Sequence, residues 1–151
     1  PKVVILPGLG ASWNSLGALG MSDPALNWKI PSFVNVYDNL INTFIANGYQ
    51  LNKDLFVWGY DWRPSIPQIS ANFDDFISST MEDDDEFILV GHSLGGLVAR
   101  WWYQDHSDDS RIKKVVSLGT PHFGAVDAYQ AWNGGSVDGR GWSSLLFNLL
   151  G

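Results

Sequence analysis

The chain has 151 residues, of which 45% are hydrophobic and 17% charged, so it has the length of one domain and enough apolar material for a core. Its formal net charge of -7 argues against a nucleic acid as partner, because phosphate contacts need clustered lysine and arginine. The absence of cysteine excludes a disulfide framework, a thiolate metal site and a cysteine nucleophile, and we expect neither a metal ion nor another cofactor.

Apolar runs and turn signals predict seven elements that alternate between strand and helix. In chain order these are a strand over 2–6, a helix from Val34 to Ile45, a strand over 55–58, a helix over 69–77, a strand over 87–90, a helix over 93–103 and a strand over 112–118. Parallel neighbours need a helical crossover between them, and strands that are apolar throughout are buried on both faces. The order therefore predicts the α/β class, with a parallel sheet covered by helices on both faces.

Four candidate residues follow the four predicted strands: Leu9, Asp61, Ser93 and His122. In open parallel sheets, ligands bind beyond the carboxyl ends of the strands. We therefore expect these four residues at one edge of the sheet, where a site can form.

The strongest motif is Gly-His-Ser-Leu-Gly at 91–95, a G-x-S-x-G sequence between a predicted strand and a predicted helix. A sharp turn there forces Ser93 into a strained conformation and lifts its hydroxyl into the open, while glycine leaves room for the approaching helix. The helix also directs free N–H groups and its positive dipole end at that point. We interpret Ser93 as a nucleophile; the alternative is an ordinary glycine-serine turn.

A second motif, Pro-Gly-Leu-Gly at 7–10, follows the first predicted strand. Serine hydrolases with a nucleophile of this type place one oxyanion donor in such a loop and the other directly after the serine. We therefore expect the backbone N–H groups of Leu9 and Leu94 to form an oxyanion hole. A plain tight turn is the alternative, since Pro-Gly marks many ordinary turns.

These two motifs and two further ones resemble the lipase branch of the α/β-hydrolases, close to the lecithin:cholesterol acyltransferase and bacterial triacylglycerol lipase families. The matching segments are Val-Ile-Leu-Pro-Gly-Leu-Gly at 4–10, Tyr-Asp-Trp-Arg at 60–63, Gly-His-Ser-Leu-Gly-Gly at 91–96 and Gly-Thr-Pro-His-Phe-Gly at 119–124. The second segment resembles the acyltransferases, and the fourth is similar to the bacterial lipases. The resemblance implies a parallel-sheet α/β-hydrolase fold that is incomplete in this chain and extends up to the start of a lid region.

The resemblance also bears on the catalytic triad. In the lipases that the chain resembles, the triad follows the order serine, acid, histidine, and the histidine of the fourth motif is not the base. The acid and the base are therefore expected beyond Gly151, with His122 as a pocket residue or a substitute base. His92 is expected to pack beside the turn. His106 lies about 20 Å along the helix from Ser93 at the usual rise per residue, too far to act on it.

Several further polar and aromatic residues are interpreted as structural, and some of them also as contacts for substrate. Asp61 and Arg63 are expected to pair locally and shape the pocket wall, with Trp62 as a possible substrate contact. The eight tryptophans are core residues or, in predicted loops, part of an apolar rim for substrate. The acidic run at 82–86 is a solvated turn, because it lacks the spaced carboxylates and central glycine of a calcium loop.

We expect one partial hydrolase domain over 1–151, in which about 125–151 leads into a lid. A glycine-rich stretch at 133–141 and an apolar helix capped by Ser143 or Ser144 belong to this segment. Open sheet edges predict a homodimer or association with a missing C-terminal half. No segment of the sequence resembles a signal peptide or a membrane span. Pro1 is not an initiator methionine, so we expect a processed, trimmed or partly observed chain, and export and a cytoplasmic location both stay open.

Three functions are compatible with this pattern. The first is a serine hydrolase that cleaves carboxylic esters, chiefly lipid esters, through an acyl-enzyme on Ser93. The second is an acyltransferase that uses the same site with an alcohol in place of water, and the third is a catalytically inactive module that keeps the scaffold for binding or assembly. Tryptophan-rich loops and a glycine-hinged lid favour a lipid or other acyl ester as substrate, with a possible lipid interface.

Overall fold

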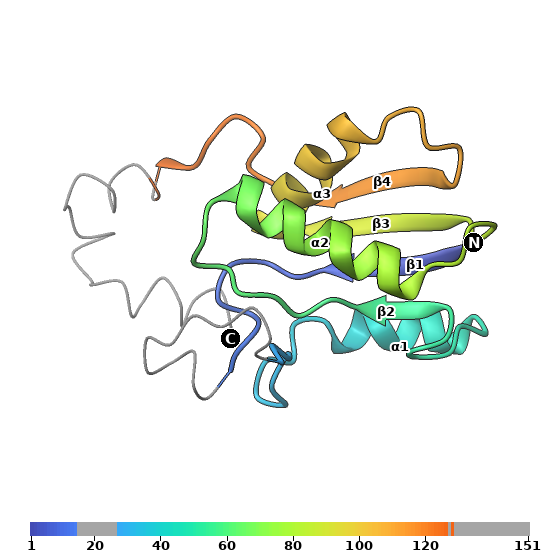
Figure 1. Ribbon diagram of the computed structural model, residues 1–151. Helices are drawn as coiled ribbons and strands as arrows, with labels where there is room; N and C mark the ends of the chain where they lie inside the picture. Colours follow the sequence, from blue (N-terminus) through green and yellow to red (C-terminus); the bar gives the residue numbers. More distant parts are fainter. Residues whose placement is uncertain (15–26, 127, 129–151) are drawn as a thin grey trace.

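The computed structural model describes residues 1–14, 27–126 and 128 (Figure 1). Its elements are β1 (Lys2–Leu6), α1 (Asp38–Ala46), β2 (Leu55–Val57), α2 (Ile66–Thr80), β3 (Phe87–His92), α3 (Leu94–Asp105) and β4 (Ile112–Leu118). The alternation of strand and helix is the predicted one. The glycine-rich stretch at 133–141 and the helix expected after Ser143 lie outside the described residues.

The four strands form one parallel sheet in the order β2-β1-β3-β4. In the register, Val3 of β1 lies opposite Leu55 of β2 and Ile88 of β3, and Val90 of β3 lies opposite Val116 of β4. The carboxyl ends of all strands face the same side, the left side in Figure 1. The loops that carry the four motifs leave from this side, as the parallel arrangement requires.

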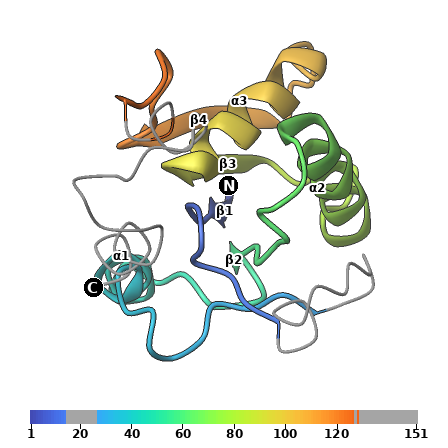
Figure 2. The ribbon, with the colours of Figure 1, turned by 90° about the vertical axis from the view of Figure 1, so that its left-hand side faces the viewer.

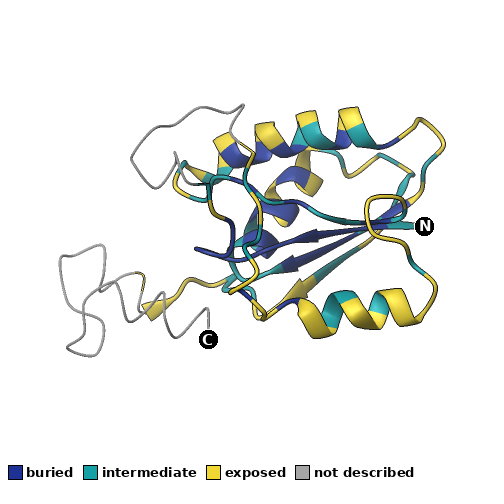
Figure 3. Ribbon diagram, turned by 90° about the horizontal axis from the view of Figure 1, so that it is seen from below, coloured by how far each residue is buried: buried dark blue, intermediate teal, exposed yellow. Residues whose placement is uncertain are grey.

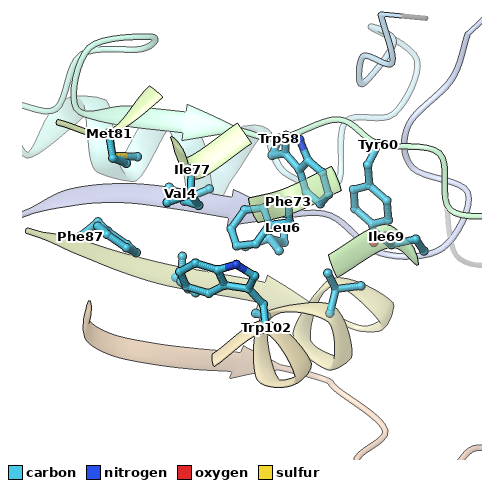
Figure 4. Close-up of a cluster of buried hydrophobic side chains, with 13 residues drawn as sticks. Val4, Leu6, Trp58, Tyr60, Ile69, Phe73, Ile77, Met81, Phe87 and Trp102 are labelled. Atoms are coloured by element: carbon cyan, nitrogen blue, oxygen red, sulfur yellow. The ribbon is translucent and has the colours of Figure 1, made fainter. Parts of the chain in front are cut away.

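Helices cover both faces of the sheet: α1 lies on one face, and α2 and α3 lie on the other (Figure 2). On the α2/α3 face, Phe73 and Trp102 pack edge to face with ring centroids 5.3 Å apart, and Trp58 tilts against Phe73 at 4.8 Å (Figure 4). All three side chains are buried. This aromatic cluster packs α2 and α3 against one face of the sheet.

The other face has a smaller core beneath α1. Val34 and Tyr37 are buried there against Val3 and Ile5 of β1 and Leu55 of β2. The two residues from the α1 side precede the helix, which corrects the expectation of a helix from Val34.

The late start of α1 has a local cause. The N–H of Val34 bonds to Pro31 O at 2.9 Å and that of Asp38 to Asn35 O at 3.0 Å, so 31–38 forms turns in place of a helical ladder. These turns still direct the side chains of Val34 and Tyr37 to the core, which explains why both residues fit the apolar spacing of a helix.

The start of α2 is specified by a capping box. The Gln68 side chain accepts from the Ser65 backbone N–H at 3.1 Å, Ser65 is extended, and Pro67 occupies the first turn. These signals set the start of the helix at Ile66, three residues before the first apolar position used in the prediction.

The sheet has two open edges within the described residues, β2 and β4. Several residues of β4, among them Lys113 and Lys114, are exposed (Figure 3). Lysines on an edge strand disfavour pairing with another strand at that edge. The predicted dimerisation is not tested by these observations and stays a prediction. Among the described helices, none is long and apolar enough to cross a membrane.

The tryptophans divide between core and surface. Trp58 and Trp102 are buried, whereas Trp13 and Trp101 are 37% and 44% exposed. Trp132 and Trp142 lie outside the described residues. The core interpretation holds for Trp58 and Trp102, whereas the apolar rim for substrate stays a prediction.

Candidate active site

Ser93 stands at a sharp turn between β3 and α3. Its φ of 52° and ψ of -119° lie outside the regions that residues with a side chain normally adopt. Its N–H donates to Leu118 O of β4 at 2.9 Å, so the turn is held to the neighbouring strand. The strained strand-to-helix turn expected from the sequence is therefore present.

The glycines around Ser93 allow main chains to touch. A Cβ on Gly91 would lie 2.4 Å from the Cα of Gly96, and one on Gly95 would lie 2.2 Å from Leu6 O. Both clashes are with backbone atoms, which cannot rotate away. Glycine at 91 lets α3 start immediately after β3, and glycine at 95 lets α3 pack against the end of β1.

The fourth motif packs on this turn through Thr120. A Cβ on Gly96 would lie 1.9 Å from the Thr120 hydroxyl oxygen, so the absence of a side chain at 96 makes room for Thr120. Gly119 and Gly124, on either side, both have positive φ, at 55° and 92°. The Gly-Thr-Pro-His-Phe-Gly segment is therefore a wall of the serine turn.

The loop after β1 approaches the same turn. A Cβ on Gly8 would lie 3.1 Å from the Ser93 Cβ and 3.0 Å from His92 Nδ1. The Gly8 N–H donates to the Tyr37 hydroxyl at 2.7 Å, and the Tyr60 hydroxyl donates to Pro7 O, also at 2.7 Å. Sequence patterns do not reveal these two contacts, because both tyrosines are far from the loop along the chain.

The two N–H groups predicted as oxyanion donors are available in this geometry. Leu94 is the first residue of α3, so its N–H has no acceptor within the helix. Leu9 follows Gly8 in the loop beside Ser93, and no acceptor for its N–H occurs among the described residues. Their role as donors stays a prediction.

His92 is a packing residue next to the turn, as expected. Its Nδ1 lies 2.9 Å from the Tyr37 hydroxyl, and the two rings meet edge to face at 5.6 Å. Partial burial lowers the pKa of His92, because the charged ring would lose water. The neutral His92 ring accepts a hydrogen bond from the Tyr37 hydroxyl and forms part of the wall of the site.

His122 turns toward β4 and α3. Its Nδ1 lies 3.3 Å from Arg100 Nη1, and its Nε2 lies 3.1 Å from the Ser117 hydroxyl. Arginine is always a donor, so Nδ1 accepts and Nε2 carries the proton. Both nitrogens are thus occupied, and no hydrogen bond joins a described side chain to the Ser93 hydroxyl. The geometry gives no support to His122 as a substitute base.

His106 has a structural environment at the end of α3. It stacks on Trp102 with ring centroids 4.2 Å apart, and its Nε2 lies 3.1 Å from Asp74 of α2. The Trp102 indole N–H donates to the same carboxylate at 2.9 Å. His106 therefore links α3 to α2, far from Ser93.

Asp61 and Arg63 form the expected local pair. The Arg63 guanidinium donates from Nε at 2.7 Å and from Nη2 at 2.6 Å to the two oxygens of Asp61. Burial raises the pKa of Asp61, but the hydrogen bonds and charge of Arg63 outweigh this effect and lower it overall. The Trp62 indole N–H donates to Ser12 O at 3.0 Å, which ties this loop to the loop after β1.

A groove of about 530 Å³ lies between α1, β2 and residues 27–32. It is on the α1 side of the sheet and is not lined by Ser93 or by the predicted pocket residues Asp61, Trp62 and His122. Their contact with substrate stays a prediction. Among the described residues, no cluster of histidine and carboxylate side chains could hold a metal ion.

The fold and this site define a class of protein. A parallel sheet flanked by helices, with a strained serine between a strand and a helix at its carboxyl edge, is the arrangement of the α/β-hydrolases. The described residues form part of such a fold.

The chain belongs to the lecithin:cholesterol acyltransferase family, whose sequence model matches residues 26–144. It is 23% identical over 137 residues to phosphatidylcholine-sterol acyltransferase from Gallus gallus. That match covers 77% of this chain and 33% of the chicken protein, so the chain spans about a third of that relative's length. The family resemblance stated from the motifs is confirmed.

Two solved structures are similar to the chain. An extracellular α/β-hydrolase from a Paenibacillus species has a TM-score of 0.48 and 21% identity, over 80% of this chain and 41% of that one. Phospholipase PlaB from Legionella pneumophila has a TM-score of 0.48 and 15% identity, over 79% of this chain and 24% of that one.

Proposed function

We propose that the protein is a serine hydrolase that cleaves lipid esters and that Ser93 carries the acyl group during the reaction. The observation that carries this proposal is the backbone of Ser93, which has a φ of 52° at the junction of β3 and α3. Backbone strain of this kind persists where a side chain must be presented for chemistry.

The reaction begins with attack of the Ser93 hydroxyl oxygen on the ester carbonyl. A tetrahedral intermediate forms, and its negative oxygen accepts hydrogen bonds from the N–H groups of Leu9 and Leu94. The start of α3 adds the positive end of the helix dipole. Each donor of this kind contributes on the order of a hundredfold to a thousandfold in rate. The bond to the alcohol then breaks as the base that took the Ser93 proton returns it to the leaving alcohol. Water attacks the acyl group, gives a proton to the same base, and the acid is released as the base returns this proton to Ser93.

A base must take the proton of Ser93. His92, His106 and His122 each have other partners, and none bonds to the Ser93 hydroxyl in the described part of the chain. We therefore assign the base and its acidic partner to residues outside the described part, in the chain order serine, acid, histidine.

A lipid substrate is supported by the family and by aromatic side chains near the loop after β1. Trp13 is 37% exposed and Phe33 is 65% exposed, and their rings meet edge to face at 6.2 Å. The Trp13 indole N–H donates to Gly10 O at 2.6 Å, which connects this apolar pair to the predicted oxyanion loop. An acyl chain that enters beside Leu9 would meet these rings.

The test is hydrolysis of short-chain and long-chain glycerolipid esters by the full-length protein and by Ser93→Ala. Loss of at least about a thousandfold in kcat/KM for Ser93→Ala is expected, as for removal of a nucleophile. Ser79→Ala is the matched control, because this exposed hydroxyl bonds only to the Phe76 carbonyl in the described structure. Unchanged hydrolysis by Ser93→Ala contradicts the proposal.

Acyl transfer is the second candidate, and the family match favours it. The same acyl group on Ser93 would be attacked by an alcohol instead of water. Product analysis with and without an added sterol or other alcohol separates the two reactions: an ester of the added alcohol indicates transfer, and free acid alone indicates hydrolysis.

A further inference from the structure

Two tyrosine hydroxyls hold one peptide group of the loop after β1. The Gly8 N–H donates to the Tyr37 hydroxyl at 2.7 Å. The Tyr60 hydroxyl donates to the Pro7 carbonyl, also at 2.7 Å. Pro7 C=O and Gly8 N–H are the two polar ends of the same planar peptide group, so both of its hydrogen-bonding groups are occupied.

The two tyrosines reach this peptide from opposite faces of the sheet. Tyr37 immediately precedes α1 and belongs to the core on that face. Tyr60 follows β2, belongs to the core on the α2/α3 face, and stacks on Trp58 at 4.7 Å (Figure 4). Each ring is only 3% exposed. Both hydroxyls are therefore fixed by packing, and the position of the peptide depends on both cores.

Tyr37 also connects this peptide to the serine turn. Because the Gly8 N–H donates to the Tyr37 oxygen, the proton of Tyr37 is free to be donated to His92 Nδ1, 2.9 Å away. Burial raises the pKa of Tyr37 and lowers that of His92, so both side chains stay neutral around pH 7. A chain of hydrogen bonds thus runs from Gly8 through Tyr37 to the residue before Ser93.

The position of this peptide matters because the next N–H along the chain is that of Leu9. A Cβ on Gly8 would be 3.1 Å from the Ser93 Cβ, so the loop and the serine are already in close approach. A small rotation of the Pro7–Gly8 peptide would turn the Leu9 N–H away from an oxyanion on Ser93. Misplacement of about 1 Å in such a site costs on the order of a hundredfold in rate.

We propose that Tyr37 and Tyr60 are positioning residues that clamp the Pro7–Gly8 peptide and so aim the Leu9 N–H at the oxyanion. This inference rests on the proposed function, in which Ser93 forms the tetrahedral intermediate. Neither tyrosine touches the reacting atoms. Their effect is expected on the transition state, because the substrate carbonyl gains its negative charge only there.

The test uses Tyr37→Phe and Tyr60→Phe in the full-length protein, with kcat and KM measured separately. Tyr37→Phe is expected to lower kcat by about tenfold to a hundredfold and to change KM by less than about twofold. Tyr49→Phe is the matched control, because its ring packs on Phe44 beside α1, away from the loop. Wild-type kcat in both clamp variants overturns the proposal.

The double variant adds a second criterion. Both hydroxyls act on one peptide group, so the loss in the Tyr37→Phe/Tyr60→Phe protein should be smaller than the product of the two single losses. A loss equal to that product would mean that the two tyrosines act independently, which contradicts a clamp. Thermal unfolding of each variant shows whether a fall in kcat accompanies general loss of structure.

Amide hydrogen exchange of Gly8 gives a readout that does not depend on activity. Tyr37→Phe removes the acceptor of this N–H, so its exchange should become at least about tenfold faster, whereas Tyr49→Phe should leave it unchanged. An unchanged Gly8 exchange rate in Tyr37→Phe overturns the clamp even where Ser93 is shown to be the nucleophile. If Ser93→Ala keeps its hydrolysis, the proposed function fails and the catalytic role of the clamp fails with it, while faster Gly8 exchange would still support the clamp as a structural contact.

Discussion

Replacement of Ser93 by glycine should stabilise the fold relative to replacement by alanine, although both variants lose the hydroxyl. Ser93 has a φ of 52° and a ψ of -119°, a conformation that a residue with a Cβ adopts only under strain. Alanine keeps the Cβ and the strain, whereas glycine has neither. The comparison of these two variants therefore isolates the backbone strain from the loss of the hydroxyl.

The expected size of the effect follows from two opposing terms. A residue held in a sparsely populated backbone region costs about 1–3 kcal/mol. The greater conformational freedom of glycine in the unfolded chain lowers the free energy of unfolding by roughly 0.4–1 kcal/mol. Ser93→Gly should therefore be about 1–2 kcal/mol more stable than Ser93→Ala.

Urea unfolding of the two full-length variants measures this difference, provided that their m-values agree. Ala71→Gly is the matched control: Ala71 is exposed within α2, and glycine there should destabilise the protein by about 1 kcal/mol. The same alanine-to-glycine change thus has opposite signs at the two positions. If glycine at 93 is as costly as glycine at 71, the backbone of Ser93 is not strained.

Three further changes test other parts of the structure. Gly95→Ala places a Cβ about 2.2 Å from the Leu6 carbonyl oxygen and should cost about 3 kcal/mol or more in urea unfolding; a cost below about 1 kcal/mol would contradict the close packing of α3 on β1. Phe73→Ala empties the centre of the aromatic cluster and should cost about 3–5 kcal/mol, whereas a change near zero would mean that the cluster is loosely packed. Hydrogen bonds from Arg111 lower the pKa of Asp109, so its stabilising effect is present above the unfolded-state pKa and is lost as the pH falls through the folded-state value. Asp109→Asn should therefore be less stable than the wild type at pH 7 and should approach it below about pH 4, and a difference that is constant with pH would contradict this.

The strands and the serine turn were predictable because their signals are local. Each strand is a short apolar run, so the bounds of β1 and β4 agree with the sequence pattern. The turn at Ser93 is flanked by glycines at fixed spacing, and the structure gives a physical reason for each of them. Positions 91, 95 and 96 all lie where another part of the main chain or Thr120 comes within contact distance.

The contacts of the two tyrosines were not predictable, because they join residues that are distant along the chain. Tyr37 meets Gly8 across 29 positions, and Tyr60 meets Pro7 across 53. In the sequence, Tyr37 fits the apolar spacing of a helix and Tyr60 belongs to a loop motif. Only the parallel order of β2, β1 and β3 brings both beside the loop after β1.

The predicted start of α1 at Val34 was wrong for a related reason. Val34 has the apolar spacing of the helix, but it lies in a turn in which its own N–H donates to Pro31 O. Periodicity reports which residues are buried, and turn chemistry decides which of them are helical. Both kinds of information are needed to place the residues that line the site.

Covalent labelling of the full-length protein shows whether Ser93 is the nucleophile. A fluorophosphonate probe should add one phosphonyl group to the intact protein, and peptide mapping should place that group on Ser93. The Ser93→Ala variant should stay unlabelled under the same conditions. Labelling at another residue, or no labelling of a protein that still hydrolyses esters, would mean that Ser93 is not the nucleophile.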